Sequence, residues 1–123
     1  MSWKILIVED NADNRELLAI MLQFKGFYIV TGIDGREGLD VAESEHPDLI
    51  ITDLNMPNLD GFEMIRLLRE HLELSATPIL VLTAYGEGDL ENAIKAGADL
   101  AMTKPTEFNS LMRCIEALIG IRE

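Results

Sequence analysis

Five short apolar runs recur along the chain, and each is about as long as one β-strand. They are ILIV at 5–8, YIV at 28–30, LIIT at 49–52, ILVLT at 79–83 and LAMT at 100–103. The stretches between these runs carry apolar side chains at helical spacing. Strands that alternate with helices in this way predict a parallel sheet with helices on both faces.

The relative hydrophobicity of the runs predicts the order of the strands. The runs at 5–8, 49–52 and 79–83 are more apolar than the other two, and central strands of a parallel sheet are buried on both faces. The flavodoxin-like order 2-1-3-4-5 places these three strands in the middle. We therefore predict an α/β, doubly wound, five-stranded parallel sheet with five helices. The chain of 123 residues has no linker, repeat or low-complexity segment, so we expect one domain over residues 1–123.

The predicted helices have recognisable apolar stripes and ends. The stripes are Leu17, Leu18, Met21 and Leu22; Phe62, Ile65 and Leu68; and Leu111, Ile115, Leu118 and Ile119. Three helix starts pair an acid with a Glu three residues later, which resembles a capping box: Asp13/Glu16, Asp34/Glu37 and Asp60/Glu63. Glycines in KGF at 25–27 and KAGAD at 95–99 stand where helices are expected to end.

The charge balance limits the classes of partner. Lys and Arg number 10 and Asp and Glu number 22, which gives a net charge of −12. Such a surface repels phosphate backbones and anionic lipids, so we expect neither direct nucleic-acid binding nor membrane binding, but a cation or a basic protein surface. No secretory signal or membrane span is evident, and the single cysteine, Cys114, lies in a helical pattern that predicts packing. These features fit a cytoplasmic protein.

Polar side chains stand at the carboxyl ends of four of the predicted strands. They are Glu9 and Asp10, Asp53, Thr83, and Lys104. The carboxyl ends of parallel strands meet at one edge, and ligands bind where the winding reverses, here between the first and third strands. Each residue alone has an ordinary explanation as a turn former, a first-turn acid or a solvated strand end. Together they predict a cluster of three carboxylates, one hydroxyl and one ammonium.

Such a cluster predicts a metal ion and phosphoryl chemistry. Two like charges 4 Å apart repel by about 4 kcal/mol at an effective dielectric constant of 20, so three carboxylates require a cation. Mg²⁺ prefers oxygen ligands and accompanies phosphate groups. A carboxylate beside Mg²⁺ and a lysine is suited to attack a phosphoryl group.

The motifs at these strand ends are similar to those of one protein family. VED at 8–10, DLNMPNLDG at 53–61, TA at 83–84 and KP at 104–105 resemble the receiver domain of two-component response regulators. The resemblance covers nearly the whole chain. It implies a phosphoacceptor switch that takes a phosphoryl group from a phosphohistidine on a sensor histidine kinase or histidine phosphotransfer domain, and then acts on a downstream protein effector. Such a switch catalyses its own modification and is not a turnover enzyme.

The resemblance also implies a role for each residue of the site. Asp53 would accept the phosphoryl group. Asp10 and Asp53 would bind Mg²⁺ directly, Glu9 through water, and Asn55 through its backbone carbonyl. Thr83 would donate its hydroxyl to the phosphoryl group and Lys104 would pair with it. Lys104–Pro105 would be a cis bond, and Pro57 and Gly61 would shape the loop after Asp53.

Two residues depart from the family pattern. Receivers usually carry Tyr or Phe three residues before the lysine, where this chain has Ala101. A methyl group has no rotamer to switch, so we expect phosphorylation to change residues 83–90 more than residues 100–112. Tyr85 is either a partly exposed loop residue or a shield over the phosphoryl group.

The sequence also bears on three other functions. A phosphatase of the haloacid dehalogenase type places its nucleophilic Asp after the first strand, usually as D-x-D, whereas DLN here follows the third. A nucleotide or flavin binder needs a glycine-rich loop after the first strand, where this chain has EDNADN. A receiver-like adaptor that works by protein binding without phosphorylation remains the alternative.

Overall fold

The computed structural model describes residues 2–84 and 86–120, and this part of the chain forms one five-stranded parallel sheet flanked by five helices. The strands are β1 (Lys4–Val8), β2 (Tyr28–Gly32), β3 (Leu49–Thr52), β4 (Ile79–Thr83) and β5 (Leu100–Thr103). The helices are α1 (Ala12–Phe24), α2 (Gly35–Glu45), α3 (Gly61–Glu70), α4 (Glu87–Ala96) and α5 (Phe108–Ile119). The strand order β2-β1-β3-β4-β5 confirms the predicted α/β architecture.

Burial of the strands follows the predicted ranking. Every residue of β3 and β4 is buried, as are the last four of β1. The edge strands are more open: Tyr28 in β2 is 55% exposed, and β5 has no fully buried residue. Hydrophobicity therefore identified the central strands, because they have a neighbouring strand on each side as well as helices on both faces.

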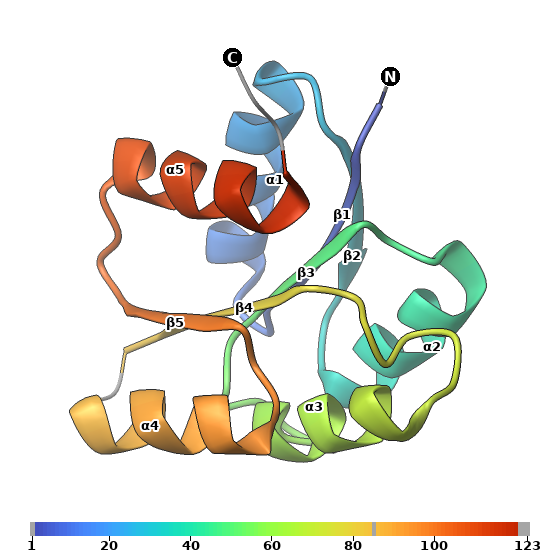
Figure 1. The fold of residues 1–123 in the computed structure, drawn as a ribbon. Helices are drawn as coiled ribbons and strands as arrows, with labels where there is room; N and C mark the ends of the chain where they lie inside the picture. The colour runs from blue at the N-terminus through green and yellow to red at the C-terminus, as the bar shows by residue number, and fades with distance from the viewer. Residues whose placement is uncertain (1, 85, 121–123) are drawn as a thin grey trace.

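The sheet separates two layers of helices (Figure 1). An apolar core lies between the sheet and each layer. Helices α1 and α5 cover one face, where Leu22, Leu111 and Ile115 pack on alternate residues of the central strands. Helices α2, α3 and α4 cover the other face, where Met64 and Ala93 pack on the intervening residues. Cys114 packs against the first of these cores and is half-buried, which agrees with its predicted packing role.

Two of the three predicted helix caps are confirmed and one is wrong. Asp34 and Asp60 are the N-caps of α2 and α3, and each accepts a hydrogen bond from the backbone N–H of the Glu three residues later. Asp13 does not cap α1, because the side chain of Asn11 accepts from the Asn14 N–H and starts that helix earlier. Gly26 and Gly97 have positive φ angles where α1 and α4 end, as expected.

The surface differs from the sequence patterns in one helix. The sequence pattern predicts Leu17 within the apolar stripe of α1, yet its side chain is 60% exposed, because α1 is apolar around much of its circumference.

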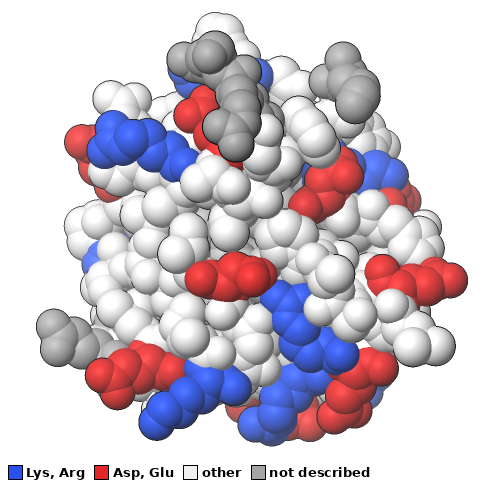
Figure 2. Space-filling model, in the orientation of Figure 1, with Lys and Arg blue, Asp and Glu red and all other residues white. Residues whose placement is uncertain are grey.

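Acidic and basic side chains are interspersed on the face shown in Figure 2, mainly along the edge formed by α3 and α4. Within residues 2–84 and 86–120, no helix has the length and apolar character needed to cross a membrane.

Candidate functional site

Strand pairing continues past the ends of the strands and brings the polar residues together. The N–H of Asp53 donates to the carbonyl of Val8 at 3.1 Å, so the residue after β3 lies beside the end of β1. In the same way the N–H of Lys104 donates to the carbonyl of Thr83 at 2.7 Å. The register of the parallel strands therefore sets the positions of these side chains.

Three carboxylates converge at this edge of the sheet. Glu9, Asp10 and Asp53 each offer an oxygen, and the three oxygens lie within 4.8 Å of one another. Glu9 is buried, Asp53 is half-buried and Asp10 is exposed. These are the hard oxygen donors that Mg²⁺ prefers, and the exposed side leaves room for water or a phosphoryl group, so the residues fit this ion.

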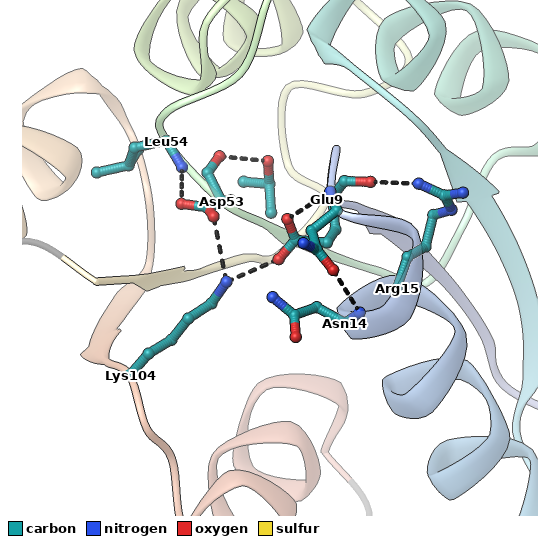
Figure 3. A network of polar contacts seen from close by, with 8 residues as sticks. Glu9, Asn14, Arg15, Asp53, Leu54 and Lys104 are labelled. Atoms are coloured by element: carbon teal, nitrogen blue, oxygen red, sulfur yellow. Dashed lines mark hydrogen bonds and ion pairs between the residues drawn. The ribbon is translucent and has the colours of Figure 1, made fainter.

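Lys104 supplies the positive charge of the site. Its Nζ donates to Oε1 of Glu9 at 2.7 Å and to Oδ2 of Asp53 at 3.1 Å (Figure 3). Burial alone would lower the pKa of Lys104, but the hydrogen bond to Glu9 and the charge of Asp53 outweigh it, so the pKa lies above its usual value. Lys104 is therefore a protonated ammonium group that bonds to two of the three carboxylates.

Backbone groups hold the two inner carboxylates in place. Oδ1 of Asp53 accepts from the Leu54 N–H at 2.6 Å, which directs Oδ2 toward Lys104. Oε2 of Glu9 accepts from the Asn11 N–H at 3.1 Å, and Nη1 of Arg15 donates to the Glu9 carbonyl at 2.8 Å. Nothing in the sequence pattern pointed to Arg15, because this contact depends on the angle at which α1 leaves β1.

The remaining predicted residues surround this centre. Thr83 is fully buried at the end of β4, and Asn55 lies exposed in the loop between β3 and α3. The Lys104–Pro105 bond is cis, as the resemblance implies. Ala101 is half-buried in β5 and packs against the core beneath α2, α3 and α4. The two interpretations of Tyr85 concern a residue outside the described part of the chain.

An apolar cavity of about 520 Å³ adjoins the site, and the sequence did not predict it. Its lining includes Asp53 and Lys104 of the site, and Leu17, Phe108 and Leu111 of α1 and α5. Its lining comes from residues that also form strand ends and helix stripes, so no separate sequence pattern marks it.

Comparison with known proteins agrees with this geometry. The family model described as the response regulator receiver domain matches residues 5–116. The polar-differentiation response regulator DivK of Brucella ovis is 31% identical over 121 residues, which cover 98% of each chain.

Two solved structures are also similar. The receiver domain of sensor histidine kinase PA1611 from Pseudomonas aeruginosa, with a magnesium ion coordinated in the active-site cleft, is 33% identical with a TM-score of 0.91, over 98% of this chain and 100% of that one. The chemotaxis response regulator CheY4 of Vibrio cholerae is 31% identical with a TM-score of 0.89, over 96% of this chain and 99% of that one. With the fold, the acidic cluster and these matches in agreement, the chain belongs to the response regulator receiver domain family of two-component signalling.

Proposed function

We propose that this chain, as one receiver domain, accepts a phosphoryl group on Asp53 in a reaction that requires Mg²⁺. The observation that carries the proposal is the meeting of Glu9, Asp10 and Asp53 within 4.8 Å, with Lys104 in contact with two of them. Members of the family are signalling switches rather than enzymes that turn over an external substrate. The proposal adds that the chain catalyses the gain and loss of its own phosphoryl group.

Four residues would hold the ion. Asp10 and Asp53 would bind it through carboxylate oxygens, Glu9 through water, and Asn55 through its backbone carbonyl. Mg²⁺ neutralises the carboxylates and the phosphoryl oxygens when it is bound. The acidic cluster and the magnesium ion in the PA1611 receiver domain support this assignment.

Asp53 is the nucleophile in this proposal. One carboxylate oxygen of Asp53 forms a bond to phosphorus while the bond from phosphorus to the donor's imidazole nitrogen breaks, and the electron pair of that bond stays on the imidazole. The Leu54 N–H, which donates to Oδ1 at 2.6 Å, keeps the carboxylate in one orientation. Holding the nucleophile in this way removes part of the entropic cost of the reaction.

Lys104 and Thr83 would stabilise the transferred group. Lys104 Nζ already lies 3.1 Å from Oδ2 of Asp53, so it can pair with phosphoryl oxygens without a long movement. Thr83 would donate its hydroxyl to one of those oxygens. The pKa of Lys104 lies above its usual value in the protein without metal, so the lysine is an ammonium before the phosphoryl group arrives.

The partners follow from the chemistry. The phosphodonor would be a phosphohistidine on a sensor histidine kinase or a histidine phosphotransfer domain, and the PA1611 receiver domain belongs to a sensor histidine kinase. A downstream protein effector would read the phosphorylated state. The net charge of −12 favours a protein partner over nucleic acid or anionic lipid, and we propose a cytoplasmic location.

Intact-mass measurement tests the reaction. The wild type incubated with acetyl phosphate and Mg²⁺ should gain the mass of one phosphoryl group, and omitting Mg²⁺ or adding a chelator should prevent the gain. Asp53→Asn, which keeps the shape and removes the nucleophile, is the matched control and should remain unmodified. An unmodified wild type would favour the alternative, an adaptor that works by protein binding without phosphorylation.

A further inference from the structure

We propose that Asp34 is a positioning residue that holds the loop beyond Asp53 in place through Asn58, and this inference rests on the phosphoacceptor function proposed above. The loop comprises residues 54–60 between β3 and α3 and carries Asn55. Asp34 lies at the start of α2, on a different element. The contact between them would fix where the Asn55 carbonyl faces the metal.

Asp34 uses its two carboxylate oxygens for different purposes. Oδ1 accepts from the Glu37 N–H at 2.8 Å and caps α2. Oδ2 accepts from the Asn58 side-chain amide at 2.6 Å, across 24 residues of sequence. Asp34 is only 8% exposed, and the bonds from Glu37 and then Asn58 lower its pKa, so it stays an acceptor. A residue needed only as a cap would use one oxygen.

A second contact presses the same loop against the start of α2. A Cβ atom at Gly35 would lie 1.9 Å from the carbonyl oxygen of Leu59, so only glycine allows this approach. Leu59 itself packs against the core beneath α2 and α3. The tip of the loop is therefore held at two successive residues, by the side-chain hydrogen bond of Asn58 and by backbone packing at Leu59.

The base of the loop is fixed separately. The Gly61 N–H donates to the Leu54 carbonyl at 2.9 Å, and a Cβ at Gly61 would lie 2.4 Å from the Asp53 carbonyl oxygen. Asn55 lies between this base and the tip. A carbonyl on such a short segment is preorganised for a ligand only while both ends are held, because an untethered loop must lose backbone entropy on binding.

Two single variants separate the Asp34–Asn58 hydrogen bond, here called the tether, from the capping of α2 by Asp34. Asn58→Gly removes the amide yet permits the observed φ of 68°. Asp34→Ser keeps a good N-cap and removes the acceptor for Asn58. His46→Gly is the matched control, because His46 is also a non-glycine residue with positive φ, 47°, and it caps the opposite end of α2.

The test measures metal affinity and, without metal, the exchange of backbone amides. Each tether variant should weaken Mg²⁺ binding about tenfold by calorimetry, as outer partners of metal ligands do. Each should also speed hydrogen exchange in residues 54–60 of the metal-free protein. The double variant should be no weaker than the worse single variant, because both remove the same contact. His46→Gly should change neither quantity.

The inference fails if Asn58→Gly binds Mg²⁺ and exchanges like the wild type, or if the two substitutions add. If circular dichroism shows that Asp34→Ser does not fold, the Mg²⁺ affinity and hydrogen exchange of Asn58→Gly alone test the inference. A wild type that binds no Mg²⁺ would instead overturn the proposed function. The exchange of residues 54–60 in metal-free protein would still test whether Asp34 holds the loop.

Discussion

At the scale of single residues, the site brings three carboxylates together with one ammonium group, so it carries an excess of negative charge. Lys104 contacts Glu9 and Asp53, while Asp10 is exposed and would be neutralised by the proposed Mg²⁺. The sequence predicted which residue types end each strand, since that depends only on the positions of the strands. It did not predict the Asp34–Asn58 or Arg15–Glu9 contacts, which depend on how helices and loops are oriented in space.

Lys104→Met should make the stability of the protein less sensitive to alkaline pH. Because the pKa of Lys104 is raised in the folded state, its stabilising contribution is complete below the unfolded pKa of about 10.4 and is lost as pH rises through the folded pKa. Urea unfolding should show a stability advantage of wild type over Lys104→Met at pH 8 that shrinks above pH 10.5. Lys95→Ala, which removes an exposed lysine, is the control, and its difference from wild type in unfolding free energy should not change over this pH range. A constant difference for Lys104→Met would contradict the ion-pair assignment.

Asp10→Ala should weaken Mg²⁺ binding about tenfold or more and slightly stabilise the metal-free protein. Removing one carboxylate takes away a ligand and relieves repulsion of about 1 kcal/mol, the value for charges 4 Å apart in water, since Asp10 is exposed. Calorimetry and urea unfolding in chelator measure the two effects. Asp13→Ala, which also removes one acid, is the control: it should leave Mg²⁺ affinity unchanged, and it should not stabilise the protein, because an acid in the first turn of α1 interacts favourably with the helix dipole. Equal Mg²⁺ affinity in Asp10→Ala and wild type would remove Asp10 from the metal site.

At the scale of elements, the core is built on the buried central strands β1, β3 and β4, and the loop after β3 packs closely against the end of that strand. Strand bounds were predicted to within two residues, because apolar runs are short and turn formers end them. The exposed face of α1 was not predicted, since Leu17, Ile20 and Phe24 continue the apolar character around that helix. Periodicity distinguishes a core face only when the other face is polar.

Gly61→Ala should destabilise the protein by about 1–3 kcal/mol, the usual cost of forcing an atom into a packed site. The new Cβ would lie 2.4 Å from the Asp53 carbonyl oxygen and 2.7 Å from the Leu54 Cα, and neither backbone atom can move without shifting the loop. Urea unfolding measures the effect.

Gly88→Ala is the matched control for this change. A Cβ at Gly88 meets no atom within 4 Å, and the residue lies in α4, so alanine should stabilise the protein by about 0.5–1 kcal/mol. If both substitutions had the same sign, close packing at Gly61 would not explain the result.

At the scale of the whole molecule, the question is how a change at Asp53 reaches the surface. Ala101 pairs with Val81 of β4 and packs on the core below α2, α3 and α4. Similar receivers carry an aromatic ring at this position, and a methyl group cannot change rotamer as a ring can. A two-state shift from 1:99 to 99:1 needs about 5.5 kcal/mol of differential stabilisation. We expect this chain to deliver it mainly through the start of α4.

Hydrogen exchange with and without beryllofluoride, a phosphoryl mimic, should locate the response. Protection should change at residues 83–90, of which Tyr85 lies outside the described part of the chain, more than at residues 100–112. Ala101→Phe, which restores an aromatic ring, should shift part of the response to residues 100–112. Changes centred on residues 100–112 in the wild type would show that another side chain replaces the ring.

The proposal that Asp53 carries the phosphoryl group is tested most directly by locating the modified residue. Borohydride reduces an aspartyl phosphate to homoserine, so protein treated with acetyl phosphate and Mg²⁺ and then reduced can be digested and sequenced by mass spectrometry. The account predicts homoserine at position 53, and none there when Mg²⁺ is omitted. Homoserine at another aspartate, or a phosphoryl group on His46 or His71, would contradict it.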